Sequence, residues 1–286
     1  MEIVRAERYG GFCGGVKQAW TLALDAREKT SGPIYVTGEL IHNRPAMAEL
    51  QAKGIEIAHP LQRELPKGAT LLVRAHGEGP ATYEAAEKQG VNLVDASCAI
   101  VQRVQRRAVE WERQGYQVIL FGHREHPESK ATIAYTKQGT IIESVAEAEA
   151  LPHFPKIAAL AQTTVLQSDY DRVCEVLATK CDEFQNQGRI CTWTQLAQEE
   201  AAEIAHTVDV MVVVGGKHSS NTQQLARVCG AICPTYHIET VDELRPEWFA
   251  GARRVGLTAG ASTRDADVDA TAERIQSFEA RGAAVR

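Results

Sequence analysis

One pattern of residues occurs three times along the chain, and it constrains the fold more than any other feature of the sequence. Each copy begins with a cysteine: Cys13, Cys98 and Cys191. A glycine follows each cysteine after 25, 24 and 24 residues, and these glycines are Gly38, Gly122 and Gly215. Four residues beyond each glycine lies a polar side chain: His42, His126 and Ser219. Three copies in register predict three similar structural units of about 90 residues each.

Between these positions, apolar strand-like segments alternate with helix-like segments. The strand-like segments are residues 1–5, 34–36, 70–73, 93–94, 118–121, 157–160, 208–214 and 254–257. Residues 99–114 are typical of an amphipathic helix, because apolar side chains recur there every three or four residues before Gly115 ends it. Strands that alternate with such helices predict βαβ units and parallel sheets. We therefore predict an α/β fold with three domains, at residues 14–97, at 98–190, and at 191–286 together with 1–13.

Each predicted unit also has a second strand that ends in a polar turn. These turns are Arg74-Ala75-His76-Gly77, Ala161-Gln162-Thr163-Thr164 and Thr258-Ala259-Gly260-Ala261-Ser262. In open parallel sheets, ligands bind beyond the carboxyl ends of the strands. Each unit therefore places one cysteine and two polar groups where a ligand would bind. The repeat predicts where a site lies but not its chemistry.

The composition limits the class of protein. The 286 residues carry a formal net charge of −6, and no long basic run offsets it, which argues against a general nucleic-acid binder. No apolar run approaches the roughly 20 residues that a membrane span needs. The N-terminus lacks a basic segment followed by an apolar one, so no secretory signal is visible. We therefore predict a cytoplasmic protein that has neither a nucleic-acid nor a membrane partner.

The three repeated cysteines are candidate metal ligands. If the three units pack around one axis, their thiolates can converge on one point, and each cysteine precedes a helix whose N-terminus favours an anionic group. Thiolates suit an iron–sulfur cluster or zinc, whereas free cysteines also pack as small apolar side chains. The residues alone leave these three interpretations open. For the remaining cysteines we predict core packing: Cys174, Cys181, Cys229 and Cys233.

The sequence resembles the 4-hydroxy-3-methylbut-2-enyl diphosphate reductases, the LytB/IspH family of the non-mevalonate isoprenoid route. The motifs that carry the resemblance in the first half of the chain are Gly11-Phe12-Cys13-Gly14-Gly15-Val16, Ile41-His42-Asn43, Ala75-His76-Gly77, Asp95-Ala96-Ser97-Cys98 and His126-Pro127-Glu128. Those in the second half are Gln162-Thr163-Thr164, Gly215-Gly216-Lys217-His218-Ser219-Ser220-Asn221 and Thr258-Ala259-Gly260-Ala261-Ser262. Any one motif is unspecific, but together they run in order over essentially the whole chain.

The resemblance implies a monomeric trefoil of three similar α/β units around one [4Fe–4S] cluster bound by Cys13, Cys98 and Cys191. It implies that the substrate is an allylic diphosphate. A two-electron reduction would remove its allylic hydroxyl and give isopentenyl and dimethylallyl diphosphates. The electrons would come from a ferredoxin or a flavodoxin.

The resemblance also implies roles for individual side chains. Glu128 would supply the proton that turns the leaving hydroxide into water, Thr163 would orient that hydroxyl, and His126 would relay or position charge. A set of neutral donors and imidazoles would bind the substrate and its diphosphate: His42, His76, His126, Thr163, Ser219, Ser220, Asn221 and Ser262. These groups would replace the glycine-rich loop that other phosphate sites use.

The chain departs from the family pattern mostly near the predicted cluster ligands. Trp193 replaces an alanine, Ala197 an arginine and Arg264 a proline, while Ser97, Ala99 and residues 129–132 also differ. Two alternatives follow. One is a paralogue that has the same cluster and a different substrate. The other is a non-catalytic cluster-binding sensor, against which the retention of Glu128 and Thr163 argues.

Overall fold

The computed structural model describes residues 1–283, which contain three parallel four-stranded sheets. The chain divides into two compact units. One consists of Met1–Gly14, His42–Ala46 and the described chain from Thr192 onward, and the other of Gly15–Ile41 and Met47–Cys191. The first unit holds one sheet and the second unit holds two.

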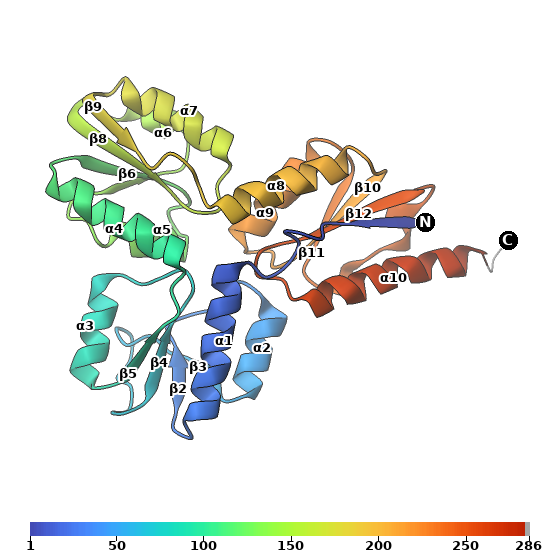
Figure 1. The fold of residues 1–286 in the computed structure, drawn as a ribbon, viewed down its shortest axis with the longest axis horizontal. Helices are drawn as coiled ribbons and strands as arrows, with labels where there is room; N and C mark the ends of the chain where they lie inside the picture. The colour runs from blue at the N-terminus through green and yellow to red at the C-terminus, as the bar shows by residue number, and fades with distance from the viewer. Residues whose placement is uncertain (284–286) are drawn as a thin grey trace. The chain divides into compact units, whose positions relative to one another are not determined.

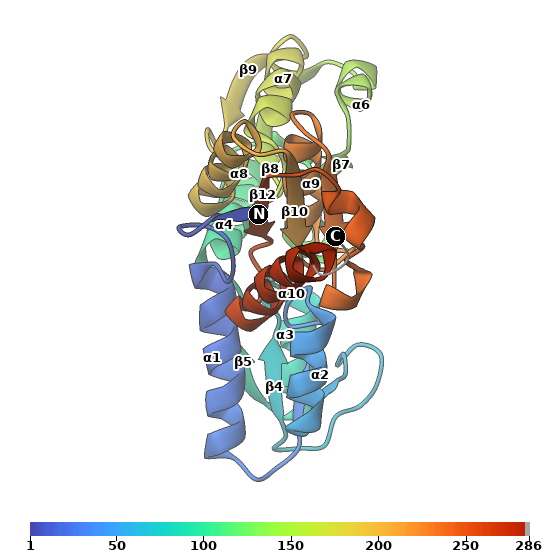
Figure 2. The same cartoon turned by 90° about the vertical axis from the view of Figure 1, so that its right-hand side faces the viewer.

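The first sheet of the larger unit has the strand order β3-β2-β4-β5. Its strands are β2 (Ile34–Val36), β3 (Ile55–Ile57), β4 (Thr70–Val73) and β5 (Asn92–Asp95). Helices α1 (Gly14–Lys29) and α2 (Arg44–Ala52) lie on one side of it, and α3 (Pro80–Gln89) lies on the other (Figures 1 and 2). Helix α1 buries a stripe of small side chains at helical spacing, namely Ala19, Ala23 and Ala26.

The second sheet of this unit has the order β7-β6-β8-β9. Its strands are β6 (Gln117–Phe121), β7 (Thr140–Ile142), β8 (Phe154–Ala161) and β9 (Cys181–Asn186), and its helices are α4 (Ala99–Arg113), α5 (Pro127–Ile133), α6 (Val145–Ala150) and α7 (Gln167–Ala178). Alternate residues of β6 face opposite cores, because Val118 packs with residues of α4 and Ile119 with residues of α7. Helices therefore cover both faces of this sheet (Figure 1).

The sheet of the smaller unit has the order β1-β12-β10-β11. Its strands are β1 (Glu2–Arg5), β10 (Val210–Val214), β11 (Thr235–Ile238) and β12 (Arg254–Ala259). Helices α8 (Thr192–Ala205) and α9 (Ser220–Gly230) pack on one face, and α10 (Asp265–Ala283) packs on the other. Two 3-10 turns, Val241–Glu243 and Pro246–Phe249, lead from β11 toward β12.

All three sheets share one topology. In each, the first strand of the repeat (β2, β6 or β10) pairs with the next strand on one side and with the next but one on the other. The fourth position is filled by β5, by β9 and, in the third sheet, by the N-terminal strand β1. The predicted α/β class and the threefold repeat are confirmed. The residue boundaries of three domains and their arrangement as a trefoil stay predictions.

Most predicted elements agree with the structure. The helix predicted at residues 99–114 is α4, and the segments 34–36 and 70–73 are strands with the predicted limits. The strand predicted at 208–214 begins two residues later, at Val210. Four strands were not predicted: β3, β7, β9 and β11. Within residues 1–283 no helix combines the length and the apolar character that crossing a membrane requires.

Candidate active site

The carboxyl ends of β6 and β8 carry several of the predicted site residues. These strands are neighbours, and the strand order runs outward from them in opposite directions, which is where α/β sheets bind ligands. A loop from Gly122 to His126 follows β6 and leads into α5, whereas Gln162, Thr163 and Thr164 follow β8. The fold therefore brings residues 126–128 and 162–164 together, although they lie 35 positions apart in the chain.

Glu128 and Thr163 form a two-point contact. The backbone N–H of Thr163 donates to Oε1 of Glu128 at 2.7 Å, and the Thr163 hydroxyl donates to Oε2 at 2.7 Å. Only 3% of Glu128 is exposed, and this burial raises the pKa of its carboxyl to about 7, although both bonds from Thr163 act to lower the pKa. A carboxyl with a pKa near neutrality is partly protonated at neutral pH and can release its proton, as a general acid must.

His126 and His76 form a second contact in the larger unit, and His126 lies two residues before Glu128 in the chain. His126 is the N-cap of α5, where its Nδ1 accepts a hydrogen bond of 3.2 Å from the backbone N–H of Glu128. In the neutral ring the proton is therefore on Nε2, which leaves that atom as a donor. The ring of His76 meets the ring of His126 edge-on, with centroids 5.4 Å apart and an interplanar angle of 86°. The two imidazoles thus form one half-buried pair.

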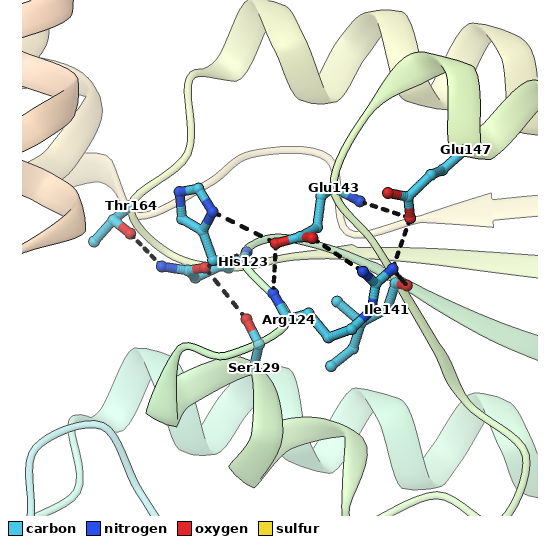
Figure 3. Close-up of polar contacts among 8 residues, drawn as sticks. His123, Arg124, Ser129, Ile141, Glu143, Glu147 and Thr164 are labelled. Atoms are coloured by element: carbon cyan, nitrogen blue, oxygen red, sulfur yellow. Dashed lines mark hydrogen bonds and ion pairs between the residues drawn. The ribbon is translucent and has the colours of Figure 1, made fainter.

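Gln162 bonds to residues that follow both β6 and β8, among them Ser129 and Thr164, which Figure 3 labels. Its side chain is 1% exposed, and its Oε1 accepts from the backbone N–H of His123 at 2.9 Å and from the Ser129 hydroxyl at 3.2 Å. Its Nε2 donates to the Thr164 hydroxyl at 2.7 Å. This amide therefore ties the loop after β6 and the first turn of α5 to the residues that flank Thr163.

Arg124 fixes the outer side of the same loop. Its guanidinium pairs with Glu143 at 3.0 Å and with Glu147 at 2.7 Å, and its backbone N–H donates to Glu143 at 2.8 Å (Figure 3). Each of these side chains is 36–49% exposed, so the ion pairs contribute little stability singly. Their effect is to orient the loop that carries His126.

Cys98 and Cys191 lie close together in the larger unit. Cys98 is the N-cap of α4, and burial raises the pKa of its thiol, with smaller upward contributions from Cys191 and Glu128. The N–H groups of Ile100 and Val101 act in the opposite direction. A Cβ on Gly15 would lie 2.6 Å from the Cys98 sulfur, so only glycine lets the first turn of α1 approach this thiol.

Cys13 belongs to the smaller unit and directly precedes α1. Its backbone N–H donates to the carbonyl of Ala261 at 3.0 Å, which fixes it near the polar turn after β12. All three repeated cysteines are free, half-buried and placed immediately before a helix. Three thiols placed before helices, one of them approached through a glycine, fit the donor set of a cluster.

The other cysteines occupy apolar cores. Cys229 is fully buried among side chains of α8 and β10, and Cys233 packs against the same core. Cys174 and Cys181 pack against the core between β8 and α7. Burial raises the pKa of the Cys174 thiol to about 11 and that of Cys229 to about 12. Such thiols stay protonated and unreactive at neutral pH.

Helix α9 begins with a group of buried polar side chains. Ser219 is its N-cap and accepts a hydrogen bond from the backbone N–H of Thr222. Asn221 is 4% exposed, and neither its Nδ2 nor its Oδ1 has a hydrogen-bond partner among residues 1–283. An unpaired buried amide costs free energy, so a partner from outside the chain would stabilise this pair of atoms. The N-terminus of α9 favours an anionic one.

Ser262 and the segment at His42 lie together in the same unit. The Ser262 hydroxyl donates to the carbonyl of His42 at 3.1 Å, and the side chain of Asn43 donates to the carbonyl of Ser262 at 2.8 Å. A Cβ on Gly216 would lie 2.7 Å from the His42 carbonyl, so a glycine is needed where these backbones meet. The turn after β12 and the turn after β10 both therefore contact residues 42–43.

The predicted site residues thus form two groups, one in each compact unit. The larger unit contains Cys98, Cys191, His76, His126, Glu128 and Thr163. The smaller unit contains Cys13, His42, Ser219, Ser220, Asn221 and Ser262. The convergence of the two groups on one substrate stays a prediction.

The departures from the family pattern have local partners in the structure. Trp193 meets the ring of Tyr9 edge-on at 5.1 Å between centroids, and Ala197 is 3% exposed in the core beside β10. Arg264 forms a bidentate ion pair with Asp267 at 2.7 and 3.0 Å in the first turn of α10. Arg264 is therefore paired and Ala197 packed within the smaller unit, whereas the buried Nε1 of Trp193 has no hydrogen-bond partner among residues 1–283.

Sequence reasoning missed two polar contacts that lie beyond strand ends, one made by Gln162 and one made by Glu78. Gln162 belongs to the motif Gln162-Thr163-Thr164, but nothing in the sequence indicated that its side chain accepts a hydrogen bond from the Ser129 hydroxyl. Glu78 pairs with Arg74 at 2.8 Å and lies 3.4 Å from His59, and it is 5% exposed. Arg74 and Glu78 lie in the turn and loop after β4, not in a helix, so their spacing by four residues gave no signal of this pair.

Comparison with known proteins extends over nearly the whole chain. The model of the family described as LytB protein matches residues 3–276. A protein of Caldanaerobacter subterraneus subsp. tengcongensis named 4-hydroxy-3-methylbut-2-enyl diphosphate reductase is 39% identical over 283 residues, which cover 98% of each chain. A protein of Aquifex aeolicus with the same name is 38% identical over 285 residues and 97% of each chain.

Solved structures agree with these sequence matches. One, of (E)-4-hydroxy-3-methyl-but-2-enyl diphosphate reductase, the terminal enzyme of the non-mevalonate pathway, is 36% identical with a TM-score of 0.71, covering 96% of this chain and 99% of that one. Another, of the E-1-hydroxy-2-methyl-but-2-enyl-4-diphosphate reductase from Plasmodium falciparum, is 26% identical with a TM-score of 0.90, covering 95% of this chain and 87% of that one.

Proposed function

Because this chain belongs to the LytB protein family, we propose that it reduces 4-hydroxy-3-methylbut-2-enyl diphosphate to isopentenyl and dimethylallyl diphosphates. The observation that carries the proposal is the buried carboxyl of Glu128, whose pKa burial raises to about 7 and which lies in the same unit as Cys98 and Cys191. A sensor that only bound a cluster would need the cysteines but not this acid. The proposal includes a monomeric, cytoplasmic enzyme with three α/β domains.

The proposed cofactor is one [4Fe–4S] cluster held by Cys13, Cys98 and Cys191. When bound, such a cluster supplies the electrons and an open iron that acts as a Lewis acid, neither of which a side chain can provide. The chain supports it with three free thiols at helix N-termini and with Gly15, whose lack of a side chain leaves room for the Cys98 sulfur. The electron donor is proposed to be a ferredoxin or a flavodoxin.

The proposed reaction consumes two electrons and two protons for each carbon–oxygen bond that breaks. One proton converts the leaving hydroxide into water, and the other completes the new carbon–hydrogen bond. Glu128 would give the first proton, because it is the buried carboxyl whose pKa lies near neutrality at these strand ends. The hydroxyl of Thr163, which now donates to Oε2 of Glu128, would orient the substrate hydroxyl toward that proton.

The proposed diphosphate site uses neutral donors instead of lysine or arginine. His42, Ser219, Ser220, Asn221 and Ser262 would contribute from the smaller unit, and His76 and His126 from the larger. The unpartnered amide of Asn221 at the N-terminus of α9 supports this assignment, since a phosphate oxygen could accept from its Nδ2.

Turnover is expected to decline as the pH rises above about 7. Glu128 donates only when protonated, and above its pKa of about 7 the protonated fraction falls tenfold for each further pH unit. A bound anionic substrate disfavours ionisation, so the decline should begin at or somewhat above pH 7. The check is the pH profile of kcat with a chemical reductant. A kcat that stays constant from pH 6 to 9 would remove the acid role.

Replacing Asn221 with alanine is expected to weaken diphosphate binding without destabilising the free protein. The lost hydrogen bond to a charged group is worth roughly 1.5–3 kcal/mol, which corresponds to about ten- to a hundredfold in Kd. The Asn221 amide makes no bond within residues 1–283, so the Tm of the free protein should not fall. Calorimetric titration with the diphosphate and thermal unfolding test both parts.

Asn92→Ala is the matched control for this substitution, because Asn92 is exposed and its side chain donates only to the Gly68 carbonyl. Its Kd should stay at the wild-type value. If Asn221→Ala also binds the diphosphate with wild-type affinity, α9 does not form part of the diphosphate site.

The proposed function is tested by anaerobic turnover of the cluster-reconstituted protein. With 4-hydroxy-3-methylbut-2-enyl diphosphate as substrate, reduced methyl viologen should be oxidised at a rate that depends on both protein and substrate. Two viologen radicals should be consumed for each molecule reduced. If the protein carries iron and sulfide but oxidises no viologen with this substrate, the proposal is wrong for this chain.

A further inference from the structure

Resting on the proposed function, we propose that the exposed side of α4 and the segment before Cys191 form the docking surface for a small acidic protein that delivers electrons one at a time. We call this surface the α4 face and define it by Arg103, Arg106, Arg107 and Arg189. All four residues lie in the larger unit. Helix α4 covers one side of the β6–β9 sheet, away from α6 and α7 (Figure 1).

The α4 face is basic in a chain that is acidic overall. Positions 103, 106 and 107 lie on one side of the helix because they are spaced by three and four residues. Arg103, Arg106 and Arg189 are exposed, and none of them has an ion-pair partner within residues 1–283. The stretch Ala99–Ala108 contains three arginines and no acidic residue, whereas the whole chain has a net charge of −6. The positive charge is therefore local and uncompensated.

The acidic side chains near the α4 face accept hydrogen bonds from other groups. Asp95, at the end of β5, accepts from the backbone N–H of Ser97 at 2.9 Å and from Gln102 at 3.2 Å. Glu110 lies one turn further along α4 and accepts from Gln114 at 3.3 Å. They border the arginines without neutralising them by direct contact.

The α4 face lies next to two of the proposed cluster ligands. Cys98 is the N-cap of α4, and Arg103 is five residues further on, or about 7.5 Å along the helix axis. Arg107 donates to the carbonyl of Gln187 at 3.0 Å, which fixes α4 to the segment that leads through Arg189 to Cys191. Helix α4 and the segment before Cys191 are therefore joined, and each carries at least one exposed arginine and adjoins one half-buried cysteine.

The need of the reaction for electrons indicates which kind of partner binds the α4 face. Two electrons must arrive for each turnover, and carriers that supply them form small, short-lived complexes that are oriented by opposite charges. An acidic carrier is repelled by the net charge of this chain but attracted to the α4 face, so the face would steer it toward the cysteines. Nucleic acid or an anionic membrane would also be attracted to the positive charge of this face, but neither supplies electrons.

The test is a double charge reversal, Arg103→Glu with Arg106→Glu, assayed with two reductants. With an acidic [2Fe–2S] ferredoxin as donor, KM for the ferredoxin should rise about tenfold or more at low salt. With reduced methyl viologen, which needs no docking surface, kcat should equal that of the wild type. Arg172→Glu on α7, across the sheet and 67% exposed, is the matched control and should leave both assays unchanged.

The outcomes separate this proposal from the proposed function. If the wild type fails with viologen, the proposed function is wrong, and calorimetric binding of the ferredoxin to the cluster-loaded protein still tests the surface. Equal ferredoxin KM or Kd in the wild type and the double variant would overturn the α4 face. So would an equal loss in Arg172→Glu, or binding to anionic vesicles or to DNA in preference to the ferredoxin.

Discussion

Glu128→Gln is expected to slow reduction of the diphosphate by about 10²–10⁴-fold while cluster content and substrate affinity stay at wild-type values. Glutamine keeps the volume of the side chain, and its carbonyl can still accept the bond of 2.7 Å from the Thr163 N–H. It has no acidic proton, so hydroxide would have to leave without being protonated by this side chain. The measurements are iron content, calorimetric Kd and kcat for the same preparations.

Glu125→Gln is the matched control for this variant. Glu125 precedes Glu128 by three residues, but its side chain is 84% exposed and pairs with Lys130. Its kcat should equal that of the wild type. A Glu128→Gln enzyme that turns over at the wild-type rate would show that the proton comes from another group, such as His126 or water.

Serine in place of Cys13, Cys98 or Cys191 is expected to remove most of the bound iron and sulfide, and with them nearly all activity. A hydroxyl is a hard donor that stays protonated at neutral pH, whereas iron–sulfur clusters require thiolates. The remaining two cysteines would leave a second iron without a protein ligand. Iron and sulfide analysis of anaerobically purified protein checks this, with about four of each expected in the wild type.

Cys174→Ser and Cys233→Ser are the controls for the ligand variants, because these cysteines are half-buried and pack against cores. Both should retain the full iron content and lose only some stability. Equal iron loss in a control and in a ligand variant would mean that the ligand set is wrong. Stoichiometric zinc without iron would point to a zinc site instead.

All six central strands could be predicted from sequence, whereas of the six edge strands only β1 and β5 could. Strands β2, β4, β6, β8, β10 and β12 occupy the middle positions of their sheets and are continuous apolar runs because both faces are covered. The unpredicted strands β3, β7, β9 and β11 are all at sheet edges. Polar residues interrupt them, as in Cys181–Asn186, because an edge strand is partly exposed. Short, mixed segments of this kind resemble loops.

The reacting residues of the site were easier to predict than the hydrogen bonds that hold them in place. The spacing of cysteines and strand-end polar residues indicated where ligands lie, and the family resemblance assigned Glu128 and Thr163 to one function. The pairing of Gln162 with Ser129 was not predictable, because it joins residues 33 positions apart through geometry that only the folded strands define. Ser129 differs from the family pattern, and the structure shows that its hydroxyl serves this local bond.

The substitutions of Trp193 and Ala197 show a second limit of sequence reasoning. A change beside a proposed ligand indicates an altered site when it is read in the sequence alone. In the folded chain Ala197 is buried in the core beside β10, where its side chain packs among apolar neighbours. Whether a position faces the site or the core follows from packing, which the local sequence does not specify.

The protonation state of Glu128 is the most direct test of the proposed acid chemistry, and difference infrared spectroscopy can measure it. In the wild type, the band of a protonated carboxyl should be present at pH 6 and should disappear as the pH rises through about 7, because burial raises the pKa of Glu128. The same band should be absent from Glu128→Gln and present in Glu125→Gln. A Glu128 that is already ionised at pH 5 would contradict the proposal that this side chain is the proton donor.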